Sequence, residues 1–247
     1  MGNPLEQERT VGIVIPAYNE AKNLLLVLNT VRSAEWIRQI VVVDDGSRDI
    51  TFAIAQQVAK KDSRLVVIRM SQNQGKAAAM LMGAQALDTD LVLFLDADLV
   101  GLKPIHLTLL ASLQMSGSCD MAIALFQHGR FLTDISHRFI PHLTGQRCLQ
   151  RLDAEQALIP LAAARYGVET GLTLYAKRQH WRIKRIIWHG VTHSMKEEKR
   201  KMIGGLYSRW QMYGQIIRVI ARNRYSNRRW FIRNRPIKKF RMPLRKS

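Results

Sequence analysis

Four short apolar runs alternate with longer segments over the first hundred residues. The runs cover residues 11–15, 40–43, 65–68 and 91–95, and they are apolar on both faces, as buried parallel strands are. Between them we expect helices over residues 20–34, 49–61 and 75–87, and Asn19 can cap the first of them. This β-α-β-α-β-α-β order with short connections predicts an α/β fold with a mostly parallel, doubly wound sheet and flanking helices. The loops that follow the strands would meet on one rim.

The second half of the chain is less regular. We expect a helix over 104–116, a strand over 121–125, a long polar connection over 126–150, a helix over 151–166 and a strand over 183–188. The connection is long for a structureless loop and is therefore a candidate functional loop. Residues 197–224 have helical character, and the tail that follows interleaves Lys and Arg with aromatic and aliphatic residues. We therefore divide the chain into an α/β domain, residues 1–196, and a basic amphipathic C-terminal extension, residues 197–247.

The charge of the chain is localised. The net charge is +19, yet residues 1–176 carry 16 Lys/Arg against 17 Asp/Glu, whereas residues 177–247 carry 22 against 2. Such an asymmetry indicates an anionic partner, either nucleic acid or an anionic membrane surface. The first ten residues do not resemble a signal peptide, and no apolar run reaches the roughly 18 residues of a membrane span. Cys119 and Cys148 have no metal-like or redox-like spacing. The expectation is a cytoplasmic protein, peripheral on the inner face of the cell membrane.

Two carboxylates, Asp96 and Asp98, end the fourth apolar run. In an open α/β sheet the carboxyl ends of the strands are where ligands bind. Hard oxygen ligands suit Mg²⁺ or Mn²⁺, which usually sit between protein carboxylates and a substrate's phosphates. The pair alone is a weak signal that favours a strand followed by an acidic turn, so the rest of the chain decides.

Three further polar clusters fall on the same rim: residues 16–20, 44–47 and 73–76. Lys76 begins a helix, where a cation opposes the helix dipole, and this mismatch favours a bound anion over a solvated lysine. Asp45 is either a ligand contact or a turn and capping residue. Together the clusters could supply residues that contact a nucleoside, a cation that faces its phosphates, and a metal site. Neither a dinucleotide glycine fingerprint nor a phosphate-loop motif is present.

These motifs resemble those of the family 2 glycosyltransferases of the GT-A fold. The resemblance rests on Ile13-Val14-Ile15-Pro16-Ala17-Tyr18-Asn19-Glu20, Val41-Val42-Val43-Asp44-Asp45-Gly46-Ser47, Asn73-Gln74-Gly75-Lys76 and Asp96-Ala97-Asp98, in order and at the usual spacing. It implies a nucleotide-sugar site in which Tyr18, Glu20 and Asp44 read the nucleoside, with Pro16 and Asp45 beside them. Lys76 and Asp96 would flank the nucleotide, and Asp98 would be the main metal ligand.

Three later segments are similar to those of enzymes related to glucosyl-3-phosphoglycerate synthase. They are Thr144-Gly145-Gln146-Arg147, Tyr166-Gly167-Val168-Glu169-Thr170-Gly171-Leu172 and Gly190-Val191-Thr192-His193. The resemblance implies that Glu169 lines the acceptor site and that His193 joins Asp96 and Asp98 as a metal ligand. It assigns Gln146 and Arg147 to an acceptor or phosphate. One departure is Arg165, which stands where the related stretch has glycine. Arg147 could instead form an ion pair, and His189 is the alternative to His193.

The resemblance implies a metal-dependent glycosyltransferase, a hexosyltransferase that uses Mg²⁺ or Mn²⁺ and a nucleotide-sugar, most simply UDP-linked. If the reaction inverts the sugar, Glu169 is the candidate base; if it retains, Glu169 would position the acceptor. Because the related enzymes often use lipid-linked acceptors, an anionic membrane is favoured over nucleic acid as the partner of the basic tail. The alternative function is a non-catalytic basic adaptor that binds nucleic acid.

Overall fold

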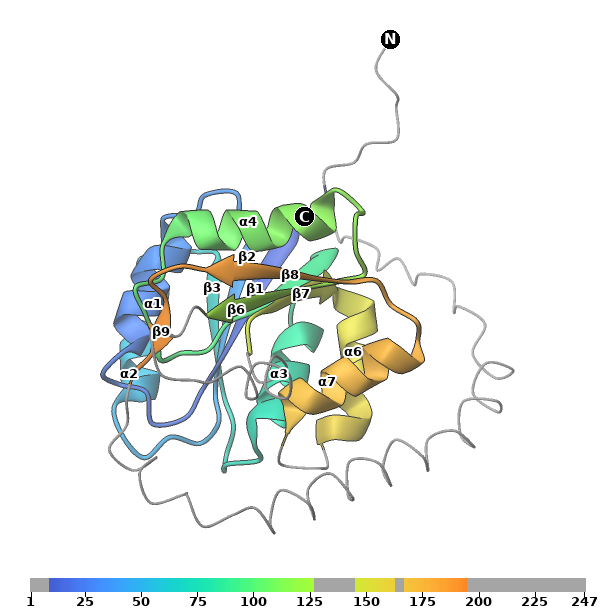
Figure 1. The fold of residues 1–247 in the computed structure, drawn as a ribbon. Helices are drawn as coiled ribbons and strands as arrows, with labels where there is room; N and C mark the ends of the chain where they lie inside the picture. Colours follow the sequence, from blue (N-terminus) through green and yellow to red (C-terminus); the bar gives the residue numbers. More distant parts are fainter. Residues whose placement is uncertain (1–8, 127–144, 163–166, 195–247) are drawn as a thin grey trace, which may run out of the picture.

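A seven-stranded sheet runs through the part of the chain that the computed structural model describes, residues 9–126, 145–162 and 167–194 (Figure 1). The strand order is β3-β2-β1-β4-β7-β6-β8. The strands are β1 (Val11–Ala17), β2 (Gln39–Asp44), β3 (Leu65–Arg69), β4 (Leu91–Phe94), β6 (Met121–Phe126), β7 (Arg147–Gln150) and β8 (Ile183–Trp188). Only β7 is antiparallel to its neighbours. The predicted mostly parallel sheet is therefore confirmed.

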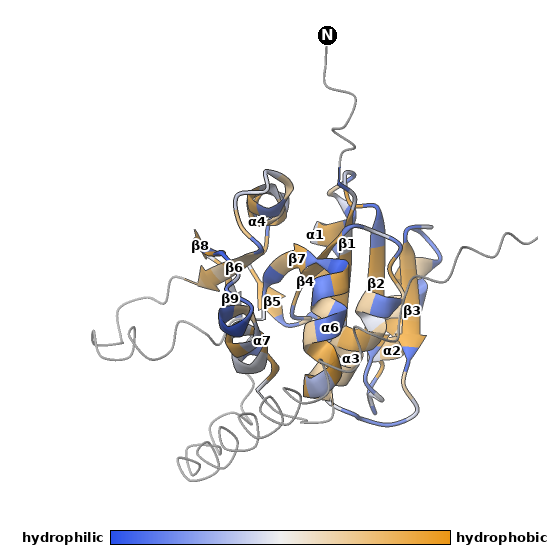
Figure 2. Ribbon diagram, turned by 90° about the vertical axis from the view of Figure 1, so that its right-hand side faces the viewer, coloured by the Kyte–Doolittle hydropathy of each residue, from blue (hydrophilic) through white to orange (hydrophobic). Residues whose placement is uncertain are grey.

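Helices cover both faces of the sheet (Figure 2). On one face lie α1 (Leu24–Arg32), α2 (Thr51–Ala59) and α4 (Pro104–Met115), and on the other lie α3 (Lys76–Gln85), α6 (Arg151–Ala162) and α7 (Val168–Arg178). Each layer shares a separate apolar core with the sheet, because the strands are apolar on both sides. The doubly wound architecture is as predicted, although α7 was not expected as a helix.

Two predicted boundaries near the first strand are wrong. β1 does not stop before Pro16 but continues to Ala17. It pairs with β4 only as far as Val14. At Pro16 the edge of β1 that faces β4 therefore has no strand partner, so the N–H group that proline lacks is not required there. The first helix begins at Leu24 rather than residue 20. Asn19 adopts a left-handed φ of 53°, and its side chain accepts a hydrogen bond from the Arg48 N–H instead of capping a helix.

The predicted connection over residues 126–150 is also partly wrong, because its last four residues form β7. This strand inserts antiparallel between β4 and β6, with Leu93 opposite Cys148. Four residues are too few to show a periodic pattern, and the strand forms because its two neighbours supply hydrogen-bond partners on both edges. Residues 127–144 lie outside the described part of the chain.

A second, two-stranded sheet joins β5 (Leu99–Val100) to β9 (Thr192–His193) in antiparallel register, with Leu99 opposite His193. The Ser194 N–H donates to the Asp98 carbonyl at 2.9 Å. Gly101 follows with φ +77°, and a Cβ there would overlap the Gly190 carbonyl oxygen. The close approach of these two glycines lets the end of the described chain lie directly beside Asp98.

The basic C-terminal extension, including the predicted helix over 197–224, lies outside the described residues. The division at 196/197 therefore stays a prediction. Among the helices of the described residues, none combines the length and apolar character that a bilayer crossing demands.

Replacing Gly101 with Ala tests the β5–β9 contact. We expect Gly101→Ala to lower the free energy of unfolding by roughly 2–4 kcal/mol, because a left-handed alanine costs about 1–2 kcal/mol and the methyl also meets the Gly190 carbonyl. Gly117→Ala is the matched control: its φ is +65° but nothing lies within 4 Å of the added Cβ. Urea unfolding measures both, and equal losses would show that the Gly190 contact contributes nothing.

Candidate active site

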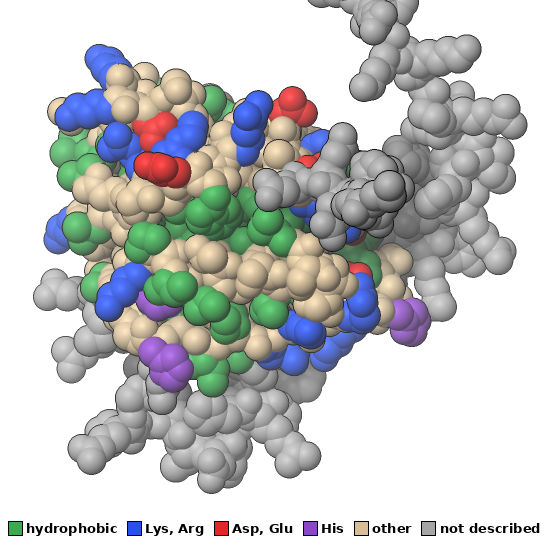
Figure 3. All heavy atoms as spheres, turned by 90° about the horizontal axis from the view of Figure 1, so that it is seen from above, with side chains coloured by type: hydrophobic (Ala, Val, Ile, Leu, Met, Phe, Trp, Pro, Cys, Tyr) green, Lys and Arg blue, Asp and Glu red, His purple; other side chains and the backbone are tan. Residues whose placement is uncertain are grey.

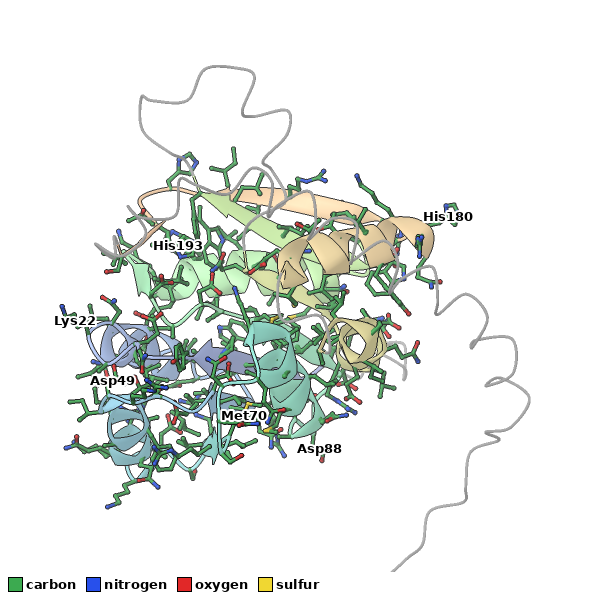
Figure 4. All side chains as sticks on the ribbon, turned by 90° about the horizontal axis from the view of Figure 1, so that it is seen from below. Lys22, Asp49, Met70, Asp88, His180 and His193 are labelled. Carbon is green, nitrogen blue, oxygen red and sulfur yellow. The ribbon has the colours of Figure 1, made fainter. Side chains whose placement is uncertain are left out.

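A cleft of about 460 Å³ opens at the carboxyl ends of β1, β2 and β4. The predicted site residues that line it are Pro16, Tyr18, Glu20, Asp45, Lys76, Asp96, Asp98, Glu169 and His193. In Figure 4 His193 lies at this end of the molecule, away from Asp88 and His180 at the start of β4 and β8. The structure therefore brings nine predicted residues together, while Asp44, Gln146 and Arg147 are not among the lining residues.

Asp96, Asp98 and His193 converge at one point of the cleft. One ligand atom from each lies within 4.8 Å of the others. His193 Nδ1 is 2.9 Å from Asp98 Oδ1, and its Nε2 is 3.9 Å from Asp96 Oδ2. Two carboxylates and an imidazole are donors that fit Mn²⁺ and are compatible with Mg²⁺. His193 belongs to this group, whereas His189 is exposed and does not. The role of His193 as a metal ligand stays a prediction.

The Lys76 ammonium bridges two carboxylates on different elements. Its Nζ is 2.6 Å from Asp96 Oδ1 and 2.6 Å from Glu169 Oε1. Burial alone would lower the pKa of Lys76, but the two carboxylates outweigh it and raise this pKa above its usual value. Burial alone would likewise raise the pKa of Asp96, and the Lys76 charge, aided by His193 and Gln146, holds it below its usual value. Two carboxylates of the protein therefore offset the positive charge of Lys76 at the start of α3, and the predicted bound anion stays a prediction.

The residues leading into β7 hold Asp96 in place. The Gln146 side-chain N–H donates to Asp96 Oδ2 at 2.9 Å. At Gly145 a Cβ would overlap the Asp96 carboxylate and crowd Lys76 Nζ. A side chain at position 145 would therefore have to displace this ion pair. The sequence resemblance assigned Gln146 to an acceptor or phosphate, and sequence reasoning missed that Gly145 and Gln146 would lie beside Asp96.

Arg147 is fully buried and binds the first turn of α7. Its Nη2 donates to the Glu169 carbonyl at 2.7 Å, and its Nη1 donates to Thr173 Oγ1 at 2.9 Å. Burial lowers the pKa of Arg147 to about 10, which leaves it charged at neutral pH. The structure therefore places Arg147 where it orients Glu169. Its predicted contact with an acceptor or phosphate stays a prediction.

The two neighbouring aspartates at the end of β2 point in different directions. Asp45 accepts hydrogen bonds from the N–H groups of Gln74 and Gly75, at 2.7 and 2.9 Å, and so anchors the loop before α3. This is the turn role that the sequence left open, and Asp45 also lines the cleft. Asp44 is fully buried, accepts from the Ser47 N–H and lies 3.4 Å from Arg69. Its role as a nucleoside contact stays a prediction.

The loop that carries Tyr18 and Glu20 is held by side chains from the next βα connection. The Asn19 N–H donates to Ser47 Oγ at 3.0 Å, and the Glu20 N–H donates to Thr51 Oγ1 at 2.8 Å. These bonds tie the two loops together on the rim and hold Tyr18 at its edge, partly exposed. The Phe126 ring, which sequence reasoning missed, packs edge-on against His193 with ring centroids 5.0 Å apart.

Comparison with known protein families gives a match over residues 12–153 to the model described as glycosyl transferase family 2. The chain belongs to glycosyl transferase family 2. The match covers more than half of the chain and includes all of the predicted donor motifs, so the resemblance drawn from those motifs is confirmed.

Among curated relatives of this family 2 chain are undecaprenyl-phosphate 4-deoxy-4-formamido-L-arabinose transferases. The protein from Proteus mirabilis strain HI4320 is 35% identical over 99 residues, which are 38% of this chain and 30% of the relative. The one from Pseudomonas aeruginosa strain PAO1 is 43% identical over 94 residues, 36% of this chain and 28% of the relative. The aligned part thus spans less than a third of these relatives.

Similar solved structures include glucosyl-3-phosphoglycerate synthase from Mycobacterium tuberculosis in complex with Mn²⁺, UDP and glucosyl-3-phosphoglycerate. It has a TM-score of 0.63 at 20% identity and covers 86% of this chain and 78% of its own. Residues 1–349 of TarS from S. aureus with UDP give a TM-score of 0.58 at 18% identity, covering 73% of this chain and 60% of that one. At this identity the likeness shows the fold, and it confirms the GT-A-type architecture.

Removing the shared cation tests the electrostatics of the cleft. We expect Lys76→Met to cost about 1–3 kcal/mol at pH 7, less than a fully buried pair because Lys76 is a third exposed. In the wild type the pKa of Asp96 is lowered, so its carboxylate stabilises the fold above about pH 4 and this contribution is lost only on further acidification. In Lys76→Met, burial without the ammonium should raise the pKa of Asp96, so protonation between pH 7 and about pH 4 should stabilise the variant. The difference in the free energy of unfolding between the two proteins should therefore narrow from pH 7 to about pH 4.

Thermal unfolding across this pH range, in a metal chelator, measures that gap. Lys60→Met is the control, because Lys60 is exposed and distant from the cleft. A gap that stays constant with pH would contradict the assigned coupling between Lys76 and Asp96.

Proposed function

We propose that this chain moves a sugar from a nucleotide-sugar, UDP-linked, to a lipid-phosphate acceptor at a membrane surface, with the help of a divalent cation. The observation that carries the proposal is the convergence of Asp96, Asp98 and His193 in the same cleft as Tyr18, Glu20 and Lys76. The family, the lipid-phosphate relatives and the fold shared with UDP-bound enzymes support it. The cleft volume is in the range of small-ligand sites.

Each group in the cleft has a defined task in this proposal. Tyr18 and Glu20 on the β1 loop read the nucleoside, and Asp96, Asp98 and His193 hold Mg²⁺ or Mn²⁺. When bound, the cation supplies electrostatic stabilisation of the charge that develops on the departing diphosphate. Lys76 adds a positive charge on the same side, at the N-terminus of α3, where anions bind favourably.

The role of Glu169 in the proposed reaction depends on the chemistry of the acceptor. A phosphate monoester is largely ionised at neutral pH, since its second pKa is about 6, and its oxygen attacks without a base. A hydroxyl acceptor in an inverting reaction would need a base instead. Glu169 is held by Lys76 through its carboxylate and by Arg147 through its carbonyl, so its position is fixed from two sides. For a lipid phosphate we assign it a positioning task.

The basic C-terminal part completes the proposal. Residues 177–247 carry 22 Lys/Arg against 2 Asp/Glu, which suits an anionic bilayer that contains the acceptor. In this proposal the protein is peripheral on the inner face of the cell membrane. Nucleic acid is the less favoured partner, because the reaction proposed for the cleft does not require it.

Binding of the donor is tested by thermal stabilisation with UDP and a panel of UDP-sugars, with and without Mn²⁺. A ligand at a hundred times its Kd should raise the free energy of unfolding by about 2.7 kcal/mol, and we expect this only with the metal present. Asp98→Asn should remove the metal-dependent part. Asp88→Asn, an exposed aspartate at the opposite end of β4, should not. Full metal-dependent stabilisation in Asp98→Asn would refute the metal site.

The acceptor class is tested with Glu169→Gln, which keeps the shape of the side chain but removes its basicity. With a lipid-phosphate acceptor we expect kcat to fall by less than about tenfold, because no proton must be removed. A base acting on a hydroxyl would instead be worth about 10²–10⁴ in rate. The control is Glu155→Gln on α6, also a glutamate paired with a basic residue, Arg151. A loss of a thousandfold would contradict the phosphate acceptor.

A further inference from the structure

The helix α4 carries no Asp, Glu, Lys or Arg in its twelve residues, although it lies on the surface. Its inner face is fully used: Leu107 and Leu110 are buried in the core, and His106 stacks on Trp188 with centroids 5.4 Å apart. Its outer face exposes Ile105, which is 54% accessible, and Leu109. Charged residues normally occupy the solvent face of such a helix, as the exposed Lys177 and Arg178 do at the end of α7.

The neighbouring elements extend this apolar surface. Leu25 and Leu26 are exposed in the first turn of α1, and Val100 is exposed on β5. α1 packs against both α4 and β5, and Thr30 Oγ1 donates to the Leu102 carbonyl between them at 3.4 Å. We call this surface the α1–α4 face; its members are Leu25, Leu26, Val100, Ile105, Leu109 and Met115. Figure 3 looks down on α4, and hydrophobic side chains gather in the middle of that view with most charged ones around them.

The α1–α4 face adjoins the cleft along the chain. Val100 follows Asp98 by two residues, at most about 7 Å of extended backbone. Leu25 likewise follows Glu20, another lining residue, by five positions. A molecule anchored on this face therefore has its polar end within reach of the metal-binding group.

Charge around the face indicates what it contacts. Lys22 precedes α1 and Lys103 precedes α4, and both are exposed. β9 pairs with β5, so the described chain ends at Ser194 beside this face, and the strongly basic residues that follow begin there. An uncharged apolar surface with lysines at its margin matches the boundary of an anionic bilayer. A two-fold contact between copies is less suitable, because it would repeat the same lysines on both sides of the contact.

We propose that the α1–α4 face inserts into the headgroup region of an anionic membrane and sets the cleft at the membrane surface. The proposal rests on the proposed function in one respect: a lipid-phosphate acceptor requires that the cleft lie at the membrane surface. The apolar side chains supply attachment that does not depend on charge, and Lys22 and Lys103 supply the preference for anionic lipid.

Vesicle flotation of the full chain tests this face with a chemically matched pair of variants. Ile105→Glu/Leu109→Glu places two carboxylates on α4. Leu152→Glu/Ile159→Glu makes the same two exchanges on α6, which packs on the opposite face of the sheet and exposes these residues to 60% and 58%. The vesicles are phosphatidylcholine with and without phosphatidylglycerol. Raised salt screens the contribution of the basic C-terminal part and leaves that of the apolar face.

We expect the wild type and the α6 variant to float with the phosphatidylglycerol vesicles at raised salt, and the α4 variant to float about tenfold less. Equal flotation of all three proteins, or an equal loss in both variants, would overturn the proposal. So would a dimer of the wild type without vesicles that only the α4 variant disrupts, since the face would then join two copies.

The same samples separate this proposal from the proposed function. Stabilisation by UDP and Mn²⁺ should be unchanged in the α4 variant, because none of its altered residues lines the cleft. Absence of that stabilisation in the wild type would refute the nucleotide site, whereas the flotation result would still decide the membrane face.

Discussion

The ion pair of Lys76 with Asp96 and Glu169 is the contact on which the cleft depends. It joins the start of α3, the end of β4 and the first turn of α7, which are far apart in the sequence. Without the ammonium, two partly buried carboxylates would face each other across a gap that a single Nζ now spans at 2.6 Å on both sides. Glycine at 145 leaves room for this pair, and Arg147 fixes the backbone of Glu169. One cation thus adds an ionic link between Asp96 of the first half and Glu169 of the second, beside the strand pairing and the shared core.

The first half of the fold could be predicted because its signals are local. Runs such as Leu91 to Leu95 are apolar on both sides, and this alone marks a buried parallel strand. Parallel strands end on one rim, so the meeting of Tyr18, Asp45 and Asp96 followed without any distance information. The errors at Pro16 and Asn19 arose where the three-dimensional surroundings, a strand with one free edge and a loop bonded to its neighbour, overrode local preference.

The second half could not be predicted in the same way, because its elements are defined by their partners. β7 is four residues long and exists only between β4 and β6. The choice of His193 over His189 depends on the register of β9 against β5, which no pattern within residues 189–193 reveals. Gln146 and Arg147 carry polar groups typical of a binding site, yet their bonds run to Asp96 and to the backbone of α7. The family match likewise ends at residue 153, before Glu169 and His193.

The position of His193 has a thermodynamic consequence. It is supplied by a two-residue strand, one residue before the described chain ends, and its partners Asp96 and Asp98 lie about a hundred positions earlier. A cation held by all three would therefore clamp the last described strand onto β5. By linkage, an event in the residues that follow that weakens this strand pairing by a given factor must weaken binding of the cation, and the bound cation must oppose that event by the same factor. Cation binding and the strand pairing beside Asp98 would then be coupled in both directions.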